Sequence, residues 1–184
     1  ISALLIIIIF FPLISFADAG RIFKDNDKAV VTVKTYNKKG QQLTEGSGFI
    51  VRTDGVIVTN FHVISIASDV KVKAGDKTLD VEGLIYEDKE NDIVILKVKG
   101  ENFHAVTFGD TEKLTADEKV YVISSSDSRG NIISEGTFNG IKKITSDRKA
   151  LKITAPITHG SSGSPVFNKN GEVIGIVVFL TREE

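Results

Sequence analysis

Residues 46–62 read GSGFIVRTDGVIVTNFH. Within them, Ser47–Arg52 and Val56–Thr59 are short apolar, β-branched runs of the kind that predicts strands. Residues 53–55 (TDG) between the two runs are a turn signal, so the runs are expected to pair as an antiparallel hairpin. His62 follows the second run almost directly, which places a titratable side chain at the end of a predicted strand.

The same pattern of short runs separated by Gly, Asn and Asp continues along the chain in both directions. It predicts further strands over Ala29–Tyr36, Val70–Lys73, Thr78–Tyr86, Ile93–Val98, Lys119–Ser124, Ile132–Ile144, Ala150–Ala155, Pro165–Asn168 and Glu172–Leu180. After residue 20 no run keeps a helical period for three turns, and only 61–67 and 111–117 have room for a helical turn. The sequence therefore predicts an all-β fold with antiparallel sheets, because no helices are present to connect parallel strands.

A polar stretch over residues 101–118 indicates a joint between two halves. We expect two small barrels, one over about residues 20–105 and one over about residues 119–184. The strand pattern taken alone fits a β-sandwich nearly as well.

Composition narrows the function. The chain has 184 residues and a net charge of -1, so it lacks the basic excess that nucleic-acid binding requires. It has no cysteine, which excludes disulfides, thiolate metal sites and cysteine nucleophiles. Its three histidines are scattered and show no metal-binding spacing, so we expect neither a metal nor a cofactor.

The first nineteen residues differ from the rest. Ile1–Phe11 is almost wholly apolar, and Ala17-Asp18-Ala19 follows, as in a secretory signal cleaved to leave Gly20 as the N-terminus. The chain begins at Ile and has no Met, so we expect its true start to lie upstream; a retained membrane anchor and a buried element of the domain stay open as alternatives. We expect an exported, periplasmic or extracellular protein that contacts a membrane only through residues 1–19, if they remain.

The strongest chemical signal is the run GSSGSP at residues 160–165. Between two predicted strands, a glycine-rich turn of this kind can point successive backbone N–H groups to one side. The amides of Gly160 and Ser162 are then expected to stabilise an oxyanion, with the Ser162 hydroxyl as the nucleophile. An ordinary Gly/Ser loop is the competing interpretation.

A serine nucleophile requires a base, and His62 at the end of an apolar strand is the candidate. His104 lies in the polar joint, and His159 shares the tight turn with the serine, which makes alignment difficult. Asp92 precedes an apolar strand and could orient the imidazole, or it could cap its own turn. The order His62, Asp92, Ser162 is the order of chymotrypsin-like proteases and differs from that of subtilisins and α/β-hydrolases.

Five blocks of the chain resemble the HtrA/Deg branch of the trypsin-like serine proteases. They are Gly46–Ile50, Thr59–Ile64, Asn91–Leu96, Gly160–Pro165 and Gly171–Ile176. The resemblance implies two six-stranded-type antiparallel β-barrels with the active site between them. It makes His62 the general base, Asp92 its orienting acid and Ser162 the nucleophile, with Gly160 and Ser162 as oxyanion donors. A homotrimer is a further expectation from the family.

The chain departs from this family in two respects. Ser161 and Ser164 stand where the family usually has Asn and Gly, and both are small enough to fit. Family members usually continue into another strand and a terminal helix, and many add a PDZ domain, whereas this sequence stops at Glu184. We therefore expect an incomplete second barrel, no PDZ domain and a fragment of a longer reading frame.

By the same resemblance, the primary substrate pocket is bordered by Pro156, Ile157, Val178, Phe179 and Leu180. No acid stands among them, so cleavage after small or medium apolar residues is expected. The resulting prediction is a serine endopeptidase acting on unfolded or misfolded extracytoplasmic polypeptides. A catalytically silent binding module, a membrane-anchored regulatory protease and an esterase or lipase are the alternatives.

Overall fold

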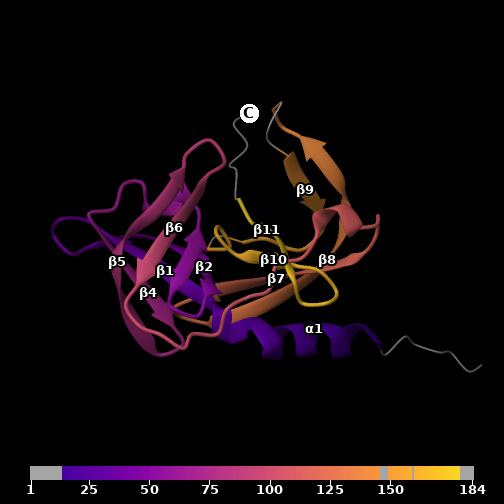
Figure 1. Ribbon diagram of the computed structural model, residues 1–184, viewed down its shortest axis with the longest axis horizontal. Helices are drawn as coiled ribbons and strands as arrows, with labels where there is room; N and C mark the ends of the chain where they lie inside the picture. Colours follow the sequence, from indigo (N-terminus) through magenta and orange to yellow (C-terminus); the bar gives the residue numbers. More distant parts are fainter. Residues whose placement is uncertain (1–13, 146–148, 159, 179–184) are drawn as a thin grey trace, which may run out of the picture.

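The computed structural model describes residues 14–145, 149–158 and 160–178, and it consists mainly of β-strands. Figure 1 shows two β-rich halves side by side, with one helix lying along the second half. All strand pairs within the two sheets are antiparallel, so the prediction of an all-β, antiparallel fold is confirmed.

The first half is a closed barrel of six strands in the order β1-β2-β3-β6-β5-β4. Its strands are β1 (Val30–Tyr36), β2 (Gln42–Arg52), β3 (Val56–Thr59), β4 (Asp69–Ala74), β5 (Lys77–Asp88) and β6 (Ile93–Val98). The predicted hairpin is present as β2–β3, with Phe49 paired to Val58. A short helix, α2 (Phe61–Ile64), follows β3 and carries His62.

The second half is a curled five-stranded sheet in the order β11-β10-β7-β8-β9. Its strands are β7 (Lys119–Ser126), β8 (Gly130–Lys143), β9 (Lys149–Ile153), β10 (Pro165–Phe167) and β11 (Val173–Ile176). Short 3-10 turns precede the two halves, η1 (Asp27–Ala29) before β1 and η2 (Thr111–Lys113) before β7. Among the residues that the structure describes, this sheet is open, with β9 and β11 at its edges.

Predicted strand bounds agree best for β3 and β6, which contain only buried and half-buried residues. β3 and β6 have the predicted limits, whereas β2 and β5 extend further than their apolar patterns. The added residues of β2 are mostly polar or exposed, and they pair with the outer end of β1, where Thr35 meets Thr44. Backbone pairing therefore extends these strands where side-chain burial gives no signal.

Helix α1 (Ile14–Asn26) was not among the predicted elements, although a buried element of the domain was one alternative for the first nineteen residues. It begins inside the segment set aside as a signal, which hid its period from the sequence pattern. Ile22 is fully buried in a cluster with Phe167 and Val173, and packing of this kind supplies most of the stability of a helix in a protein. α1 runs through the predicted cleavage point between Ala19 and Gly20, and cleavage there stays a prediction.

One apolar cluster joins the two halves and the helix. Phe49 from β2, Tyr121 from β7 and Phe167 from β10 pack together in it with Ile22 of α1. The relative position of the two halves is thus held by core packing. None of the helices within residues 14–145, 149–158 and 160–178 has the length and apolar character needed to cross a membrane.

Candidate active site

The structure brings His62 and Asp92 into direct contact. Oδ2 of Asp92 lies 2.6 Å from Nδ1 of His62, and Oδ1 accepts the backbone N–H of His62 at 2.8 Å. An ionised carboxylate only accepts hydrogen bonds, so this geometry selects the tautomer with the proton on Nδ1. Nε2 of His62 is then left with a free lone pair, as a general base requires.

The turn before β6 explains why Asp92 is free to hold His62. Asp92 has a φ of 58°, a left-handed conformation that Asp and Asn tolerate better than most residues. Asp88, and not Asp92, caps this turn, because its carboxylate accepts both the backbone and the side-chain N–H of Asn91. The alternative in which Asp92 caps its own turn is therefore not what the structure shows.

Backbone contacts join the start of β6 to the start of α2. The carbonyl of Asp92 accepts hydrogen bonds from the Asn60 side chain at 2.9 Å and from the Phe61 backbone at 3.2 Å. Together with the carboxylate, Asp92 accepts hydrogen bonds from three consecutive residues, Asn60, Phe61 and His62. The position of the imidazole is thus set by backbone as well as by side-chain contacts.

The serine turn follows β9 and is closed by its own hydrogen bonds. Gly160 has a φ of 91°, which non-glycine residues avoid. The Ser161 amide donates to Thr158, and the Ser164 amide donates to Ser161. Within the described parts of the chain, the amides of Gly160 and Ser162 donate to no other group, so both stay available for a ligand.

Ser47 of β2 ties this turn to the first barrel. Its backbone N–H donates to the Ser162 carbonyl at 2.8 Å, and its hydroxyl donates to the Gly160 carbonyl at 2.8 Å. The same hydroxyl accepts the backbone N–H of Ser125 at 2.9 Å. Ser47 is fully buried, and it was not among the predicted site residues, although Gly46-Ser47-Gly48 is an unusual break in an apolar strand.

Two glycines let the serine turn and the histidine segment approach each other. A Cβ at Gly163 would overlap the Ser47 carbonyl and lie 2.6 Å from Oγ1 of Thr59. A Cβ at Gly46 would lie 2.8 Å from the side chain of Val63 and 3.2 Å from the Ser162 carbonyl. Val63 is the neighbour of His62, so the segments that carry His62 and Ser162 meet across Gly46.

Hydroxyl groups fill the space beneath the turn. Ser164 donates to Ser124, and Ser124 donates to Ser161, each at 3.0 Å. Oγ of Ser161 also accepts the Thr158 backbone N–H at 3.2 Å. Ser124, Ser161 and Ser164 are all buried. Ser161 and Ser164 therefore support the turn from its buried side.

Ser162 itself is nearly enclosed, with 9% of its surface exposed, while the His62 side chain is 45% exposed and the Asp92 side chain 15%. The Ser162 hydroxyl makes no hydrogen bond to His62 or to any other residue that the structure describes. The structure thus joins His62 to Asp92 directly, and joins Ser162 to them only through Gly46 and Ser47.

The residues expected to border the substrate pocket differ in their burial. Pro156 is exposed, and Ile157 packs against the apolar cluster of the second half. Val178 is half-buried after β11. Phe179 and Leu180, like His159, lie outside the described residues.

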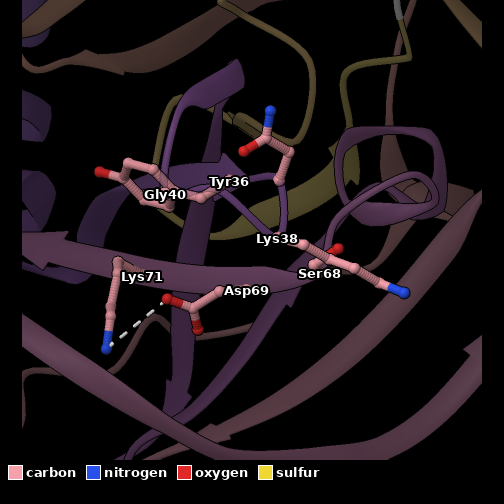
Figure 2. A pocket seen from close by; sticks show the side chains of 7 residues that line it. Tyr36, Lys38, Gly40, Ser68, Asp69 and Lys71 are labelled. Atoms are coloured by element: carbon pink, nitrogen blue, oxygen red, sulfur yellow. Dashed lines mark ion pairs between the residues drawn. The ribbon is translucent and has the colours of Figure 1, made fainter.

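A hollow of about 680 Å³ lies on the first barrel, at the end of β1. Figure 2 shows Tyr36 and Lys38 near Asp69 and Lys71 in its lining. Lys71 is paired with Asp80 at 2.8 Å and with Asp69 at 3.9 Å. The pocket therefore has no free charge from Lys71 to offer a ligand, and none of His62, Asp92 and Ser162 lines it.

No group of three or more His, Asp or Glu side chains in the described part of the chain is arranged to hold a metal ion.

Comparison with known proteins identifies the family. Residues 46–176 match the model of the trypsin-like peptidase domain. The chain is 35% identical over 134 residues to a probable periplasmic serine endoprotease, DegP-like, of Pseudomonas putida, which covers 71% of this chain and 28% of the relative. It is 31% identical over 154 residues to the anti-sigma-I factor RsgI9 of Acetivibrio thermocellus, covering 83% of this chain and 22% of that protein.

The chain thus spans only about a quarter of the length of these relatives. Among solved structures, the crystal structure of Deg5 is similar, with a TM-score of 0.79, 22% identity, and coverage of 89% of this chain and 85% of the Deg5 chain. This similarity shows that the closed barrel and the curled sheet form a chymotrypsin-like double barrel whose second half is incomplete in the described residues.

Proposed function

Because the chain belongs to the trypsin-like peptidase family, in its HtrA/Deg branch, we propose that it is a serine endopeptidase with the triad His62, Asp92 and Ser162. The observation that carries this proposal is the pair of contacts from the Asp92 carboxylate to the ring and backbone of His62. A serine–histidine mechanism needs an acid that orients the imidazole. An aspartate with a purely structural role would not need to contact the ring.

In the proposed reaction, Oγ of Ser162 attacks the carbonyl carbon of a peptide bond and Nε2 of His62 takes the hydroxyl proton. His62 then gives this proton to the leaving nitrogen as the C–N bond breaks, which leaves an acyl ester on Ser162. Water, deprotonated by His62, attacks the ester; His62 returns this proton to Oγ of Ser162 as the ester C–O bond breaks and the acid is released. Asp92 stays ionised throughout and stabilises the imidazolium that forms twice in the cycle.

The amides of Gly160 and Ser162 hold the oxyanion in this scheme. Support comes from the positive φ of Gly160 and from the absence of an internal acceptor for either amide within the described residues. Donors of this kind lower the barrier of acyl transfer by about 3 kcal/mol each. Ser47 contributes by holding the carbonyls of Gly160 and Ser162, which fixes the serine turn against the first barrel.

Unfolded extracytoplasmic polypeptides are the proposed substrates, with small or medium apolar residues at the cleavage position. The names of the DegP-like relatives support the periplasmic or extracellular setting. Pro156, Ile157, Val178, Phe179 and Leu180 are proposed to border the pocket, and no acid stands among them to select Lys or Arg.

Hydrolysis of unfolded casein by the full chain, beside the Ser162→Ala variant, tests the proposal. We expect peptide release by the first and none by the second. Labelling with a fluorophosphonate adds a readout at the nucleophile itself, because the probe reacts only with a serine that has its base and oxyanion donors in place. Correctly folded protein without labelling or peptide release would contradict the proposal.

A second candidate function is regulatory proteolysis of one partner. It is favoured by the match to an anti-sigma-I factor over 83% of this chain. Cleavage of casein at many sites would support the general peptidase, whereas fluorophosphonate labelling without casein cleavage would favour an enzyme specialised for one partner.

A further inference from the structure

We propose that the distal β8–β9 hairpin, formed by residues 141–145 and 149–152, is a docking surface for acidic segments of polypeptide substrates. The proposal rests on the peptidase function above and adds a substrate class to it. Figure 1 shows the far ends of β8 and β9 rising from the second half, on the side opposite α1.

The hairpin carries four lysines and no acid among its described residues: Lys142, Lys143, Lys149 and Lys152. All four are exposed, and none forms an ion pair with any residue that the structure describes. The whole protein has a net charge of -1, so this is a local basic region on a nearly neutral chain.

Three lysines on other strands of this protein form ion pairs with acids. Lys71 of β4 faces Asp80 across the sheet, Lys97 of β6 pairs with Glu82, and Lys119 of β7 pairs with Glu135. In the hairpin, by contrast, Lys143 and Lys149 are direct partners in the ladder. Like charges opposite each other destabilise a sheet, so an anionic ligand would relieve a repulsion built into the fold.

Apolar side chains accompany the charges. Ile141 and Ile144 are 50% and 43% exposed, whereas Phe138, nearer the middle of β8, is buried. A surface with lysines beside exposed isoleucines can hold both the carboxylates and the aliphatic parts of an extended acidic chain.

The arrangement favours a polypeptide over a flat membrane surface. The register puts Lys143 and Lys149 on one face of the hairpin, and Lys142 and Lys152 on the other. A planar bilayer could meet only one of these faces, whereas a flexible chain can contact both. β9 ends at Ile153, and the turn that carries Ser162 follows it in the sequence, so the hairpin and the proposed nucleophile belong to the same half of the molecule.

Binding is tested on the full chain carrying Ser162→Ala, so that no probe is cleaved. The probes are a fluorescein-labelled peptide of alternating Glu and Ser and a matched peptide with Gln for Glu, followed by fluorescence anisotropy. We expect the Glu peptide to bind roughly tenfold more tightly at low salt, since several exposed ion pairs contribute. This preference should weaken as salt is added.

The variant Lys142→Gln/Lys143→Gln/Lys149→Gln/Lys152→Gln should lose the preference for the Glu peptide. A matched control, Lys39→Gln/Lys77→Gln, removes two exposed lysines of the first barrel that also lack an ion pair in the described residues, and it should keep the preference. Equal binding of the two peptides, or retention of the preference by the hairpin variant, would overturn the proposal. Lysine-dependent binding to phosphatidylserine vesicles without binding of the Glu peptide would overturn it in favour of a membrane surface.

Activity separates the two proposals. With the active chain, a peptide substrate carrying a Glu-rich tail should show a lower KM than its Gln-tailed match, at unchanged kcat, and the hairpin variant should abolish the difference. Lysine-dependent binding of the Glu peptide without any hydrolysis would sink the peptidase function and leave the binding surface standing. Hydrolysis with the same KM for the Glu-tailed and Gln-tailed substrates would overturn the docking surface and leave the peptidase function standing.

Discussion

The Asp92 carboxylate holds His62 at two points, through the backbone N–H at 2.8 Å and through Nδ1 at 2.6 Å. The two oxygens of one carboxylate thus determine both where α2 begins and how the imidazole is turned. Any change at Asp92 is therefore expected to alter the tautomer of His62 before it alters the fold, because the backbone contacts of Asn60 and Phe61 to the Asp92 carbonyl remain.

Asp92→Asn should lower kcat by about 10⁴, since an amide at this position can favour the tautomer with Nε2 protonated. Asn tolerates the left-handed φ of 58° at this position, so the thermal midpoint should change little. Hydrolysis of a fluorogenic peptide and thermal unfolding measure the two effects. Asp80→Asn, at an exposed acid of β5, is the control and should leave kcat unchanged. An Asp92→Asn variant with full activity would remove Asp92 from the mechanism.

Ser162→Ala and His62→Ala should each lower kcat by about 10⁶, and the double variant should be no worse than either. The reason is that the nucleophile and its base act together in one step, so removal of either side chain already abolishes that step. Single-turnover hydrolysis of a peptide ester gives the three rates. Losses that add up in the double variant would show that the two side chains act independently.

Gly163→Ala should destabilise the fold by roughly 3 kcal/mol or more, because the new Cβ would overlap the Ser47 carbonyl at a backbone φ of 85°. Gly40→Ala is the matched control: its φ is 75°, but nothing lies within 4 Å of the new Cβ. That variant should cost only about 1–2 kcal/mol, the penalty of the left-handed conformation alone. Urea denaturation of both proteins measures the difference, and equal midpoints would contradict the close packing of the serine turn.

Asp127→Asn should lower stability at neutral pH, and this effect should shrink as the pH falls through about 2. Lys34 and Lys73 donate hydrogen bonds to the Asp127 carboxylate and lower its pKa from 3.8 to about 2. A lowered pKa in the folded state means that the contribution is complete above about pH 4 and is lost as the pH falls toward 2. Denaturation midpoints of the two proteins should converge over this window. If the midpoints of the two proteins differed by the same amount at every pH down to 2, the ion pairs of Asp127 would not be the source of the stability difference.

Tyr121→Phe should be neutral or stabilising by about 1 kcal/mol, because it removes a buried hydroxyl that has no partner among the described residues. Burial of the Tyr121 side chain also raises its pKa to about 12. Urea denaturation checks the sign of the change. A clear loss of stability would mean that the hydroxyl has a hydrogen-bond partner in solution.

Local patterns sufficed for the strands of the first barrel and for the turns between them. β3 and β6 were predicted with their observed limits, because alternation and turn residues report burial directly. Helix α1 was missed because it begins inside the segment set aside as a signal, and because its burial depends on Ile22 packing in a cluster with distant residues such as Phe167 and Val173.

Local sequence patterns were enough to predict an all-β fold and to propose His62, Asp92 and Ser162, in that order, as site residues. Contacts between distant segments show in addition that Asp92 holds the ring of His62 and not its own turn, and that Ser47 fastens the serine turn to the first barrel. Strand and turn preferences act between neighbours in the chain, so they can be read from the sequence. The contact of Ser47 with Gly160 joins residues 113 positions apart, and it exists only because two separately formed halves pack against each other.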